Sequence, residues 1–347
     1  MKSGQESASY SAWEVCSDEL FKVFGYYMWI EGNMYNLTSI SDFLLLDFSN
    51  IRGLQILHFF VFLVLFLITT IGNLLIIIAI LTDYQLHSPM YFFLFCLALV
   101  DLGSVSVIIP KSMAMSLMND RSISYSGCIT QVFFSFFFGT SDFVLLNIMA
   151  HDRHVAICNP LHYERIMNKA ACVKMLAIGL IISLIHATLH TISTFVNTFC
   201  SNNVNQFFCE VPQLLKLSCS DLYLIEVGLV VLSLIIALGC FIFIIITYVQ
   251  IVAAVLKIPS VHGQKKALST CVPHLTVVSL LFITAMFSYA RPLSDISSSL
   301  DLSFAVMYSI IPPMSNPFIY SIRNKEIKNA LKKVLYMKLI PAKPSLR

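Results

Sequence analysis

Long apolar runs alternate with short polar segments along this chain, and the runs are long enough to cross a membrane as helices. Seven such runs cover residues 55–81, 91–114, 128–151, 172–196, 224–252, 267–290 and 302–322. A helix of about 20 apolar residues spans the ~30 Å hydrocarbon core of a bilayer. The pattern therefore predicts an all-α membrane protein in which residues 55–322 form a seven-transmembrane helix bundle.

Polar segments flank the predicted bundle at both ends. Residues 1–54 are expected to lie outside the membrane, and no continuous apolar stretch typical of a cleavable signal peptide is found there. Residues 323–347 form the tail. Apolar residues recur there at helical spacing opposite a basic surface, namely Ile327, Leu331, Val334 and Leu335. This spacing predicts a short amphipathic helix that lies on the inner leaflet of the lipid bilayer.

Composition supports a membrane protein and excludes several functions. The chain is 57% hydrophobic and 12% charged, whereas a soluble domain carries about 25% charged residues. The net charge of +3 is small, and no basic run is interleaved with aromatic residues as a nucleic-acid interface would require. No glycine-rich phosphate loop, HExxH or nucleophile motif stands in a fitting context, so we predict no enzyme.

The positive charges indicate how the bundle is oriented. Lysines and arginines are more numerous in the loops after the odd-numbered spans and in the tail, although the first of these loops, residues 82–89, has none. The positive-inside rule then places the C-terminus in the cytoplasm and the N-terminus outside. A sequon at Asn36 agrees with this orientation and predicts glycosylation there.

Two acidic residues interrupt the apolar spans. Asp101 lies in the second span and Asp142 in the third. A carboxylate inside a membrane is costly unless it meets a partner, water or an ion, so it is a functional hypothesis by default. Two interpretations stay open here, namely a structural acid held by hydrogen bonds and a member of an ion or water network.

An Asp152-Arg153 pair stands at the end of the third apolar run, before a polar segment that Pro160 stops. Arginine often lies at helix ends with its charge in the interface, so one interpretation is a simple interfacial ion pair. The other is a switch in which the arginine holds the acid in one conformation and releases it in another.

The ten cysteines divide by location. Those in or beside polar loops are Cys128, Cys200, Cys209 and Cys219, and most of the others lie in or next to apolar segments, where a thiol usually packs. If the loop cysteines face an oxidising compartment, two disulfides can form. Spacing alone leaves their pairing open.

Four segments together resemble the signatures of the olfactory receptor family, within the rhodopsin-like (class A) G-protein-coupled receptors. They are residues 88–94 (SPMYFFL), 149–163 (MAHDRHVAICNPLHY), 266–271 (KALSTC) and 316–326 (NPFIYSIRNKE). The resemblance implies an odorant receptor of the plasma membrane that binds small, mostly apolar volatile ligands within the bundle. It also implies activation of a heterotrimeric G protein of the olfactory stimulatory type, which raises cAMP.

The resemblance implies roles for individual residues. The positions that match the ionic lock and the groups that respond when the bundle opens are Asp152, Arg153, Tyr248, Asn316, Pro317 and Tyr320. Those that match a polar core able to hold a sodium ion as an allosteric modulator are Asp101, Asp142 and Asn316, with Asp142 where the family usually carries Glu. The matching disulfides are Cys128–Cys209, from the third span to the second outer loop, and Cys200–Cys219 within that loop. No other cofactor is implied.

The family's ligand cavity lies between the third, fifth, sixth and seventh spans. Counting along each helix from its motif gives the expected lining as Ser135, Phe136, Gly139, Thr140, Leu232, Ile236, Ala285, Met286, Tyr289, Val306 and Ser309. This set is mostly apolar with a few hydroxyls, which suits a small neutral volatile, while helix packing is the alternative for each residue. Amine ligands are disfavoured, because Ser135 stands where amine receptors of the wider class carry an acid.

The chain departs from the family pattern at several places. His151 and His154 stand where the family usually has Tyr, and Phe282 replaces a Tyr in the sixth span. An imidazole beside the lock either titrates near neutral pH or serves as a plain polar substitute. Residues 1–33 have no counterpart, and Met34 stands where the family's chains begin, so we interpret residues 1–33 as an extension from an upstream start.

Other interpretations compete with an odorant receptor. His186 and His190 have the i, i+4 spacing of metal ligands, but no acidic or thiol third ligand is near in sequence, which favours packing or a structural hydrogen bond. A receptor of the same fold for a non-odorant metabolite outside the nose is one rival. A small transporter, suggested by Asp101 and Asp142, is the other, although the inverted repeats that would support it are not found.

Overall fold

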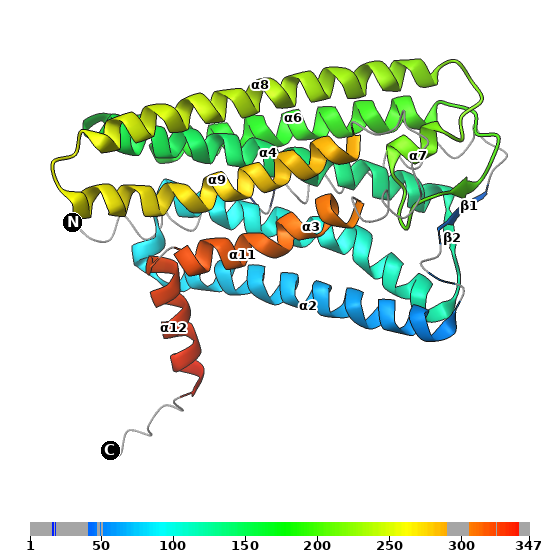
Figure 1. Ribbon diagram of the computed structural model, residues 1–347, viewed down its shortest axis with the longest axis horizontal. Coiled ribbons are helices and arrows are strands. Elements are labelled where there is room, and N and C mark those ends of the chain that lie inside the picture. Colours follow the sequence, from blue (N-terminus) through cyan, green and yellow to red (C-terminus); the bar gives the residue numbers. More distant parts are fainter. Residues whose placement is uncertain are drawn as a thin grey trace.

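Long helices lie side by side in the computed structural model (Figure 1). It describes Cys16, Asp18, residues 41–46, Ser49 and residues 51–289, 305–323 and 325–339. The helices of the bundle are α2 (Arg52–Thr82), α3 (Pro89–Met118), α4 (Tyr125–Cys158), α6 (Lys169–Phe195), α8 (Tyr223–Leu256), α9 (Val261–Tyr289) and α11 (Ile311–Arg323). Each predicted span corresponds to one of these helices, and residues 305–309 before α11 are also helical.

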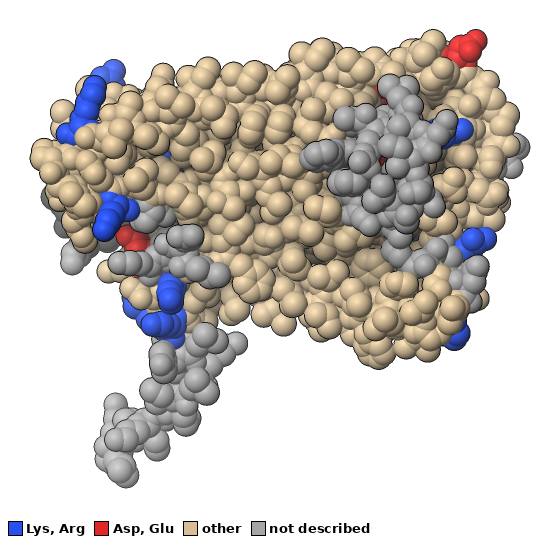
Figure 2. All heavy atoms as spheres, viewed as in Figure 1, with Lys and Arg blue, Asp and Glu red and all other residues tan. Residues whose placement is uncertain are grey.

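The surface of the bundle is apolar. In the described chain, α2, α3, α4, α6 and α8 are long and apolar enough to cross a membrane, and α9 has a shorter apolar stretch, Cys271–Met286. Large side chains such as Phe60, Ile185 and Val249 are more than half exposed. Figure 2 shows charged side chains gathered toward the two ends of the long axis, with an uncharged belt across the middle of this face. Such a belt is unfavourable in water and suits lipid.

A small sheet closes one end of the bundle, which we call the sheet end. Its strands are β1 (Asp42–Leu45), β2 (Ser122–Ser124) and β3 (Asn203–Val204), and β1 pairs antiparallel with β2 and parallel with β3. Phe43 and Leu45 are buried on one side, and the Phe43 ring packs against Tyr125 and Phe199. The sheet was not predicted, because a strand of four residues shows too little alternation to be recognised and its partners lie in distant loops.

The opposite end, which we call the α12 end, carries the predicted amphipathic helix. This helix, α12 (Lys325–Leu339), turns away from the bundle axis (Figure 1). Ile327, Ala330 and Val334 are buried, whereas Lys328 and Lys332 are exposed, so the amphipathic pattern is confirmed. Short helical segments in the described loops between the bundle helices are η1 (Tyr84–Leu86), η2 (Pro160–His162), α5 (Tyr163–Ile166) and α7 (Val211–Leu215).

Polar contacts attach α12 to the bundle. The Lys333 ammonium donates a hydrogen bond of 2.7 Å to the Asp83 carboxylate, and this bond holds the pKa of Asp83 below its usual range. The Tyr91 hydroxyl donates to the Glu326 carboxylate at 2.5 Å. The two contacts join α12 to the turn between α2 and α3 and to the start of α3.

Helices α2 and α11 approach each other closely at Gly72. A Cβ atom added there would lie 3.0 Å from Cβ of Pro317 and 3.1 Å from its Cγ. On the next residue, the Asn73 amide donates a 3.2 Å hydrogen bond to the carbonyl of Pro313. Because Gly72 has no side chain, the backbones of α2 and α11 can approach each other closely, as is common between helices in membranes.

We expect Gly72→Val to destabilise the bundle by about 1–3 kcal/mol, because the rigid Pro317 ring leaves no room for the added carbons. The measurement is the thermal unfolding midpoint of purified protein in lipid nanodiscs. Gly53→Val is the matched control on the same helix, since nothing lies within 4 Å of a Cβ built at Gly53. Equal midpoints for the two variants would contradict the close packing.

Candidate ligand cavity and switch region

A cavity of about 660 Å³ lies inside the bundle, with walls from α3, α4, α6, α8, α9 and α11. Its lining is mostly apolar, with hydroxyl and imidazole groups on part of the wall. The residues of the predicted lining that face it are Ser135, Phe136, Gly139, Thr140, Ile236, Ala285, Met286 and Ser309. The loop residue Phe208 and the α9 residue Phe282 also line it.

Other members of the predicted lining lie elsewhere. Leu232 is 52% exposed on the outside of α8, where the cavity is lined instead by Val230, Ser233 and Ala237. The placement of Leu232 in the wall was wrong, although Ile236, one turn later on the same side of α8, does line the cavity. Val306 packs against the hydrophobic core and does not line the cavity. The side chain of Tyr289 lies outside the described residues.

A line of polar side chains, which we call the polar chain, runs along the wall from α4 through α6 to α8. Its members are Thr140, His186, Ser233, His190 and Glu226. The Thr140 hydroxyl lies 2.9 Å from Nδ1 of His186, whose Nε2 lies 2.9 Å from the Ser233 hydroxyl. The same hydroxyl lies 3.0 Å from Nε2 of His190, and Nδ1 of His190 lies 2.5 Å from Oε1 of Glu226.

The His190–Glu226 end of the polar chain is deeply buried. Glu226 is 0% and His190 is 2% exposed, and the Phe136 ring stacks on the His190 ring at 4.3 Å with an interplanar angle of 2°. Sequence reasoning had placed hydrogen bonding above metal binding for the two histidines, but it did not single out Glu226 or Ser233. The signal for Glu226 was present, because an acid near the start of an apolar span is itself a functional hypothesis.

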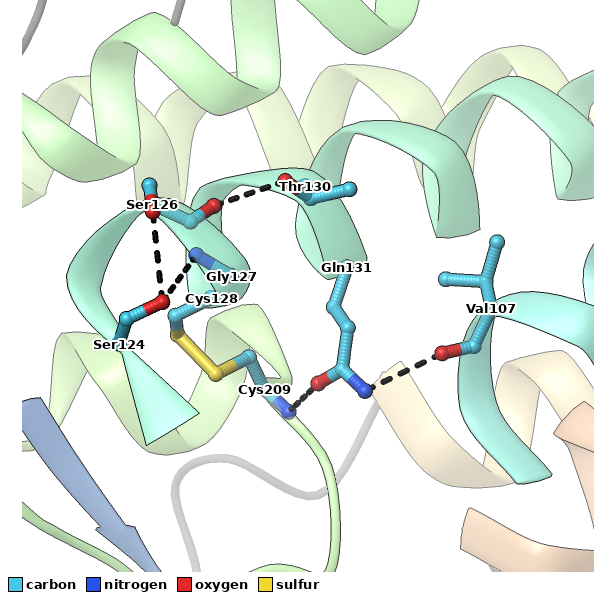
Figure 3. The surroundings of a disulfide bond; sticks show 8 residues. All are labelled: Val107, Ser124, Ser126, Gly127, Cys128, Thr130, Gln131 and Cys209. Atoms are coloured by element: carbon cyan, nitrogen blue, oxygen red, sulfur yellow. Dashed lines mark hydrogen bonds between the residues drawn. A yellow bond between two sulfur atoms is a disulfide. The ribbon is translucent and has the colours of Figure 1, made fainter. Parts of the chain in front are cut away.

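The Cys128–Cys209 disulfide holds the loop before α7 over the sheet end of the cavity. Ser124 caps the first turn of α4 by accepting a 3.1 Å hydrogen bond from the backbone N–H of Gly127, and Cys128 is the next residue. Figure 3 shows Gln131 beside the bridge, where its amide oxygen accepts from the Cys209 backbone at 3.0 Å. Phe208, one residue before the bridge, is thereby positioned in the cavity wall.

A second disulfide, Cys200–Cys219, closes the same loop on itself. The structure therefore contains both pairings that the resemblance implied. The predicted glycosylation site, Asn36, lies outside the described residues.

The Asp152–Arg153 pair lies near the α12 end of α4. Nε of Arg153 donates a 2.9 Å hydrogen bond to Oδ2 of Asp152, and the Tyr163 hydroxyl donates to Oδ1 at 2.7 Å. Asp152 is fully buried and the Arg153 side chain is 14% exposed. Burial and the neighbouring Asp152 carboxylate raise the pKa of Tyr163, so its hydroxyl remains a donor at neutral pH. The sequence had not identified Tyr163 as a third member of this group.

Among the described residues, no hydrogen bond joins Arg153 to either tyrosine assigned to the switch. The Tyr248 hydroxyl lies 2.7 Å from Nδ1 of His274, whose Nε2 lies 2.9 Å from the carbonyl of Leu146. The Tyr320 hydroxyl is buried with no hydrogen-bond partner among the described residues. This arrangement ties α9 to α4 and α8 while Arg153 remains paired with Asp152.

A buried acid lies between α3 and α11. The amide of Asn316 donates to both carboxylate oxygens of Asp101, at 3.1 and 3.0 Å. Asp142 lines the cavity and interacts electrostatically with Asp101. Oδ1 of Asp142 and Oδ1 of Asn316 are buried and have no hydrogen-bond partner among the described residues. Two buried carboxyl groups and an unpaired amide oxygen are thus gathered in the bundle.

Comparisons with known proteins identify the family. The family model described as Olfactory receptor matches residues 62–338. The chain belongs to the olfactory receptor family. Olfactory receptor 14C36 of Homo sapiens is 46% identical over 303 residues, which is 87% of this chain and 97% of the relative. Olfactory receptor 1G1 of Gorilla gorilla gorilla is 45% identical over 306 residues, which is 88% of this chain and 98% of the relative.

A rodent relative extends the same similarity. Olfactory receptor 1078 of Rattus norvegicus is 42% identical over 316 residues, which is 90% of this chain and 94% of the relative. Family membership makes the receptor a multi-pass membrane protein with seven transmembrane helices, and not an enzyme. It also sets aside the transporter interpretation of Asp101 and Asp142.

Proposed function

We propose that this receptor binds small, mostly apolar volatile odorants in the cavity and activates a heterotrimeric G protein of the olfactory stimulatory type, raising cAMP. The observation that carries the proposal is the cavity itself, about 660 Å³ inside the bundle and lined by Ser135, Phe136, Gly139 and Thr140 of α4. Ligand pockets are typically about 300–1,000 Å³ and mostly apolar with a few placed polar groups. The cavity has both properties.

Activation changes the Asp152–Arg153 pair, which lies nearer the α12 end of α4 than Ser135 and Phe136 of the cavity lining. An odorant that binds the open bundle more tightly than the closed one shifts the population toward the open state. In the open state, Arg153 leaves Asp152 and the α12 end admits the G protein. The support for this step is that α4 carries both the cavity lining and the Asp152–Arg153 pair.

In this proposal the receptor lies in the plasma membrane with the sheet end outside and the α12 end in the cytoplasm. The two disulfides at the sheet end suit an oxidising compartment. The exposed lysines of α12 suit the anionic inner leaflet.

Asp101, Asp142 and Asn316 fit a sodium ion that modulates the receptor. Hard cations prefer oxygen ligands, and Oδ1 of Asp142 and Oδ1 of Asn316 lack partners among the described residues. A bound cation would also offset the charge of two neighbouring carboxylates. We expect NaCl, compared with equal N-methyl-D-glucamine chloride, to raise the unfolding midpoint of the purified receptor, and Asp142→Asn to remove the difference. An equal midpoint in both salts would overturn the sodium site.

The test of the cavity is a cAMP reporter in cells that co-express the receptor and an olfactory G protein, screened with a panel of volatile compounds. Gly139→Trp is expected to raise the half-maximal odorant concentration by at least about tenfold, because Gly139 faces the cavity with nothing within 4 Å of an added Cβ. Gly239→Trp is the control, since Gly239 is equally open but lies outside the cavity lining. An unchanged response of the Gly139 variant would remove the odorant from this cavity.

A further inference from the structure

The wall of the ligand cavity contains both buried and exposed side chains. Ile108 of α3, Phe208 of the loop before α7 and Ser309 before α11 are each no more than 8% exposed. By contrast, Ile182 of α6 is 50% and Ile236 of α8 is 58% exposed, although both line the same cavity. A side chain that borders a cavity and also lies on the outer surface marks a place where the cavity reaches that surface. The cavity therefore opens between α6 and α8.

The sequence explains why α6 and α8 leave a space there. The polar chain joins the two helices where the Ser233 hydroxyl lies 2.9 Å from Nε2 of His186. The helices run in opposite directions, so the residues one turn closer to the α12 end are Ile182 on α6 and Ala237 on α8. Ala237 has only a methyl group, and Cys240, the next lining residue of α8, is also small. Because both are small, α8 does not fill the space beside Ile182.

At the sheet end, the described part of the loop before α7 covers the cavity. The Cys128–Cys209 disulfide fixes this loop, and its Phe208 side chain is buried in the cavity wall. Glu210 of the same loop accepts a 3.0 Å hydrogen bond from the hydroxyl of Tyr308, which also lines the cavity. A molecule that enters from water at this loop must displace a segment held by a disulfide and by a hydrogen bond.

The opening between α6 and α8, which we call the lateral opening, is bordered by Ile182, Ile236 and Ala237. Ile182 is the central residue of α6, so the lateral opening lies near the middle of the membrane. The neighbouring outer residues Ile181 and Ile235 are apolar and more than half exposed, as suits contact with lipid. A molecule that reaches the lateral opening at this depth arrives through the hydrocarbon core.

We propose that odorants enter the cavity from the membrane, through the lateral opening. This inference rests on the proposed function, since it gives the route to the same cavity and the property that admits a ligand. Each methylene raises the concentration of a compound in an apolar phase, relative to water, by about fourfold. The bilayer therefore concentrates apolar volatiles beside the lateral opening, and strongly polar compounds are not concentrated there. The receptor selects odorants by their solubility in lipid as well as by the shape of its cavity.

The test follows a small apolar probe into the cavity of the purified receptor in lipid nanodiscs, without odorant or G protein. Trp13 and Trp29, the two tryptophans of the chain, are replaced by Phe, and Phe208→Trp places a fluorescent reporter in the cavity wall. Bromoalkanes quench tryptophan fluorescence on contact, so stopped-flow mixing measures the rate at which they arrive.

The probes are 1-bromobutane, 1-bromopentane and 1-bromohexane at equal aqueous concentration. We expect the quenching rate to rise by about fourfold with each methylene, because entry follows the concentration in lipid. Entry from water would instead give a rate that hardly changes with chain length, and that result would overturn the inference.

Two pairs of variants locate the route. Ala237→Phe should slow quenching by 1-bromohexane by at least about tenfold, because the added ring occupies the lateral opening. Gly239→Phe is its control, since Gly239 lies outside the cavity lining with nothing within 4 Å of an added Cβ. Ile182→Trp, with the outer residue Ile181→Trp as control, repeats the comparison from α6. Slower quenching relative to the control in either pair supports the route, and equal rates within both pairs would overturn it.

These measurements need no odorant response, so they separate failure of the route from failure of the proposed function. Silence toward every volatile compound in the cAMP assay, with surface display confirmed, would overturn the proposed function and, with it, the identity of what enters. Normal activation by odorants, together with equal bromoalkane rates in the variants and their controls, would leave the proposed function standing and overturn the lateral route.

Discussion

Replacement of Arg153 by alanine is expected to abolish odorant-evoked cAMP while the receptor remains at the cell surface. Arg153 pairs with Asp152 in the structure, and in the proposed mechanism it is the group released when the bundle opens. Without the guanidinium, the switch has no cation to move between the two states. Asp152 keeps the hydrogen bond from Tyr163, so we expect the helix end to remain folded.

The measurement is cAMP and surface immunostaining in the same cells. Arg165→Ala is the control, because Arg165 is an exposed arginine of α5 beyond the Asp152 group. Arg153→Gln retains a hydrogen-bond donor for Asp152 but lacks the positive charge. It should likewise give no odorant-evoked cAMP. Normal signalling from either Arg153 variant would remove the switch assignment.

Loss of the Cys128–Cys209 disulfide is expected to prevent surface display. The bridge joins residues 81 apart in sequence, and removal of such a bridge typically costs about 2–5 kcal/mol. It also releases the Gln131 contact to the loop and the support for Phe208 in the cavity wall. A receptor of marginal stability that loses this much is retained by quality control.

Cys128→Ser and Cys209→Ser should therefore show equally low surface staining, and the double variant should be no worse than either single one. Cys158→Ser is the matched control, because Cys158 is a free thiol near the α12 end. Surface staining of the Cys128 variant equal to that of the Cys158 variant would show that the bridge is dispensable.

Local patterns were enough to predict the helices. The apolar pattern placed α3, α6 and α8 within four residues of their observed ends, because a membrane span depends on the composition of one continuous segment. The same logic predicted α12 from its own residues. The short sheet was missed, since β1 is stabilised by Phe43 packing on rings that come from other segments.

The cavity was only partly predictable. Counting from a motif within α4 placed Ser135, Gly139 and Thr140 in its wall, as the structure does. Of the two residues counted along α8, Ile236 lines the cavity and Leu232 does not. The rotation of a helix about its axis is decided by the helices beside it, and the apolar surface of α8 carries no internal signal for which side faces lipid. Helix phase is therefore a tertiary property here.

The sequence by itself determined the seven spans, the amphipathic tail and, through its motifs, the family, because each of these depends on residues close together in the chain. Only the tertiary structure decided that Glu226 meets His190 and that His186 meets Thr140, contacts between residues 36 and 46 positions apart. Such contacts depend on the relative rotation of three helices, and a buried charge must be matched in space, which no local pattern encodes.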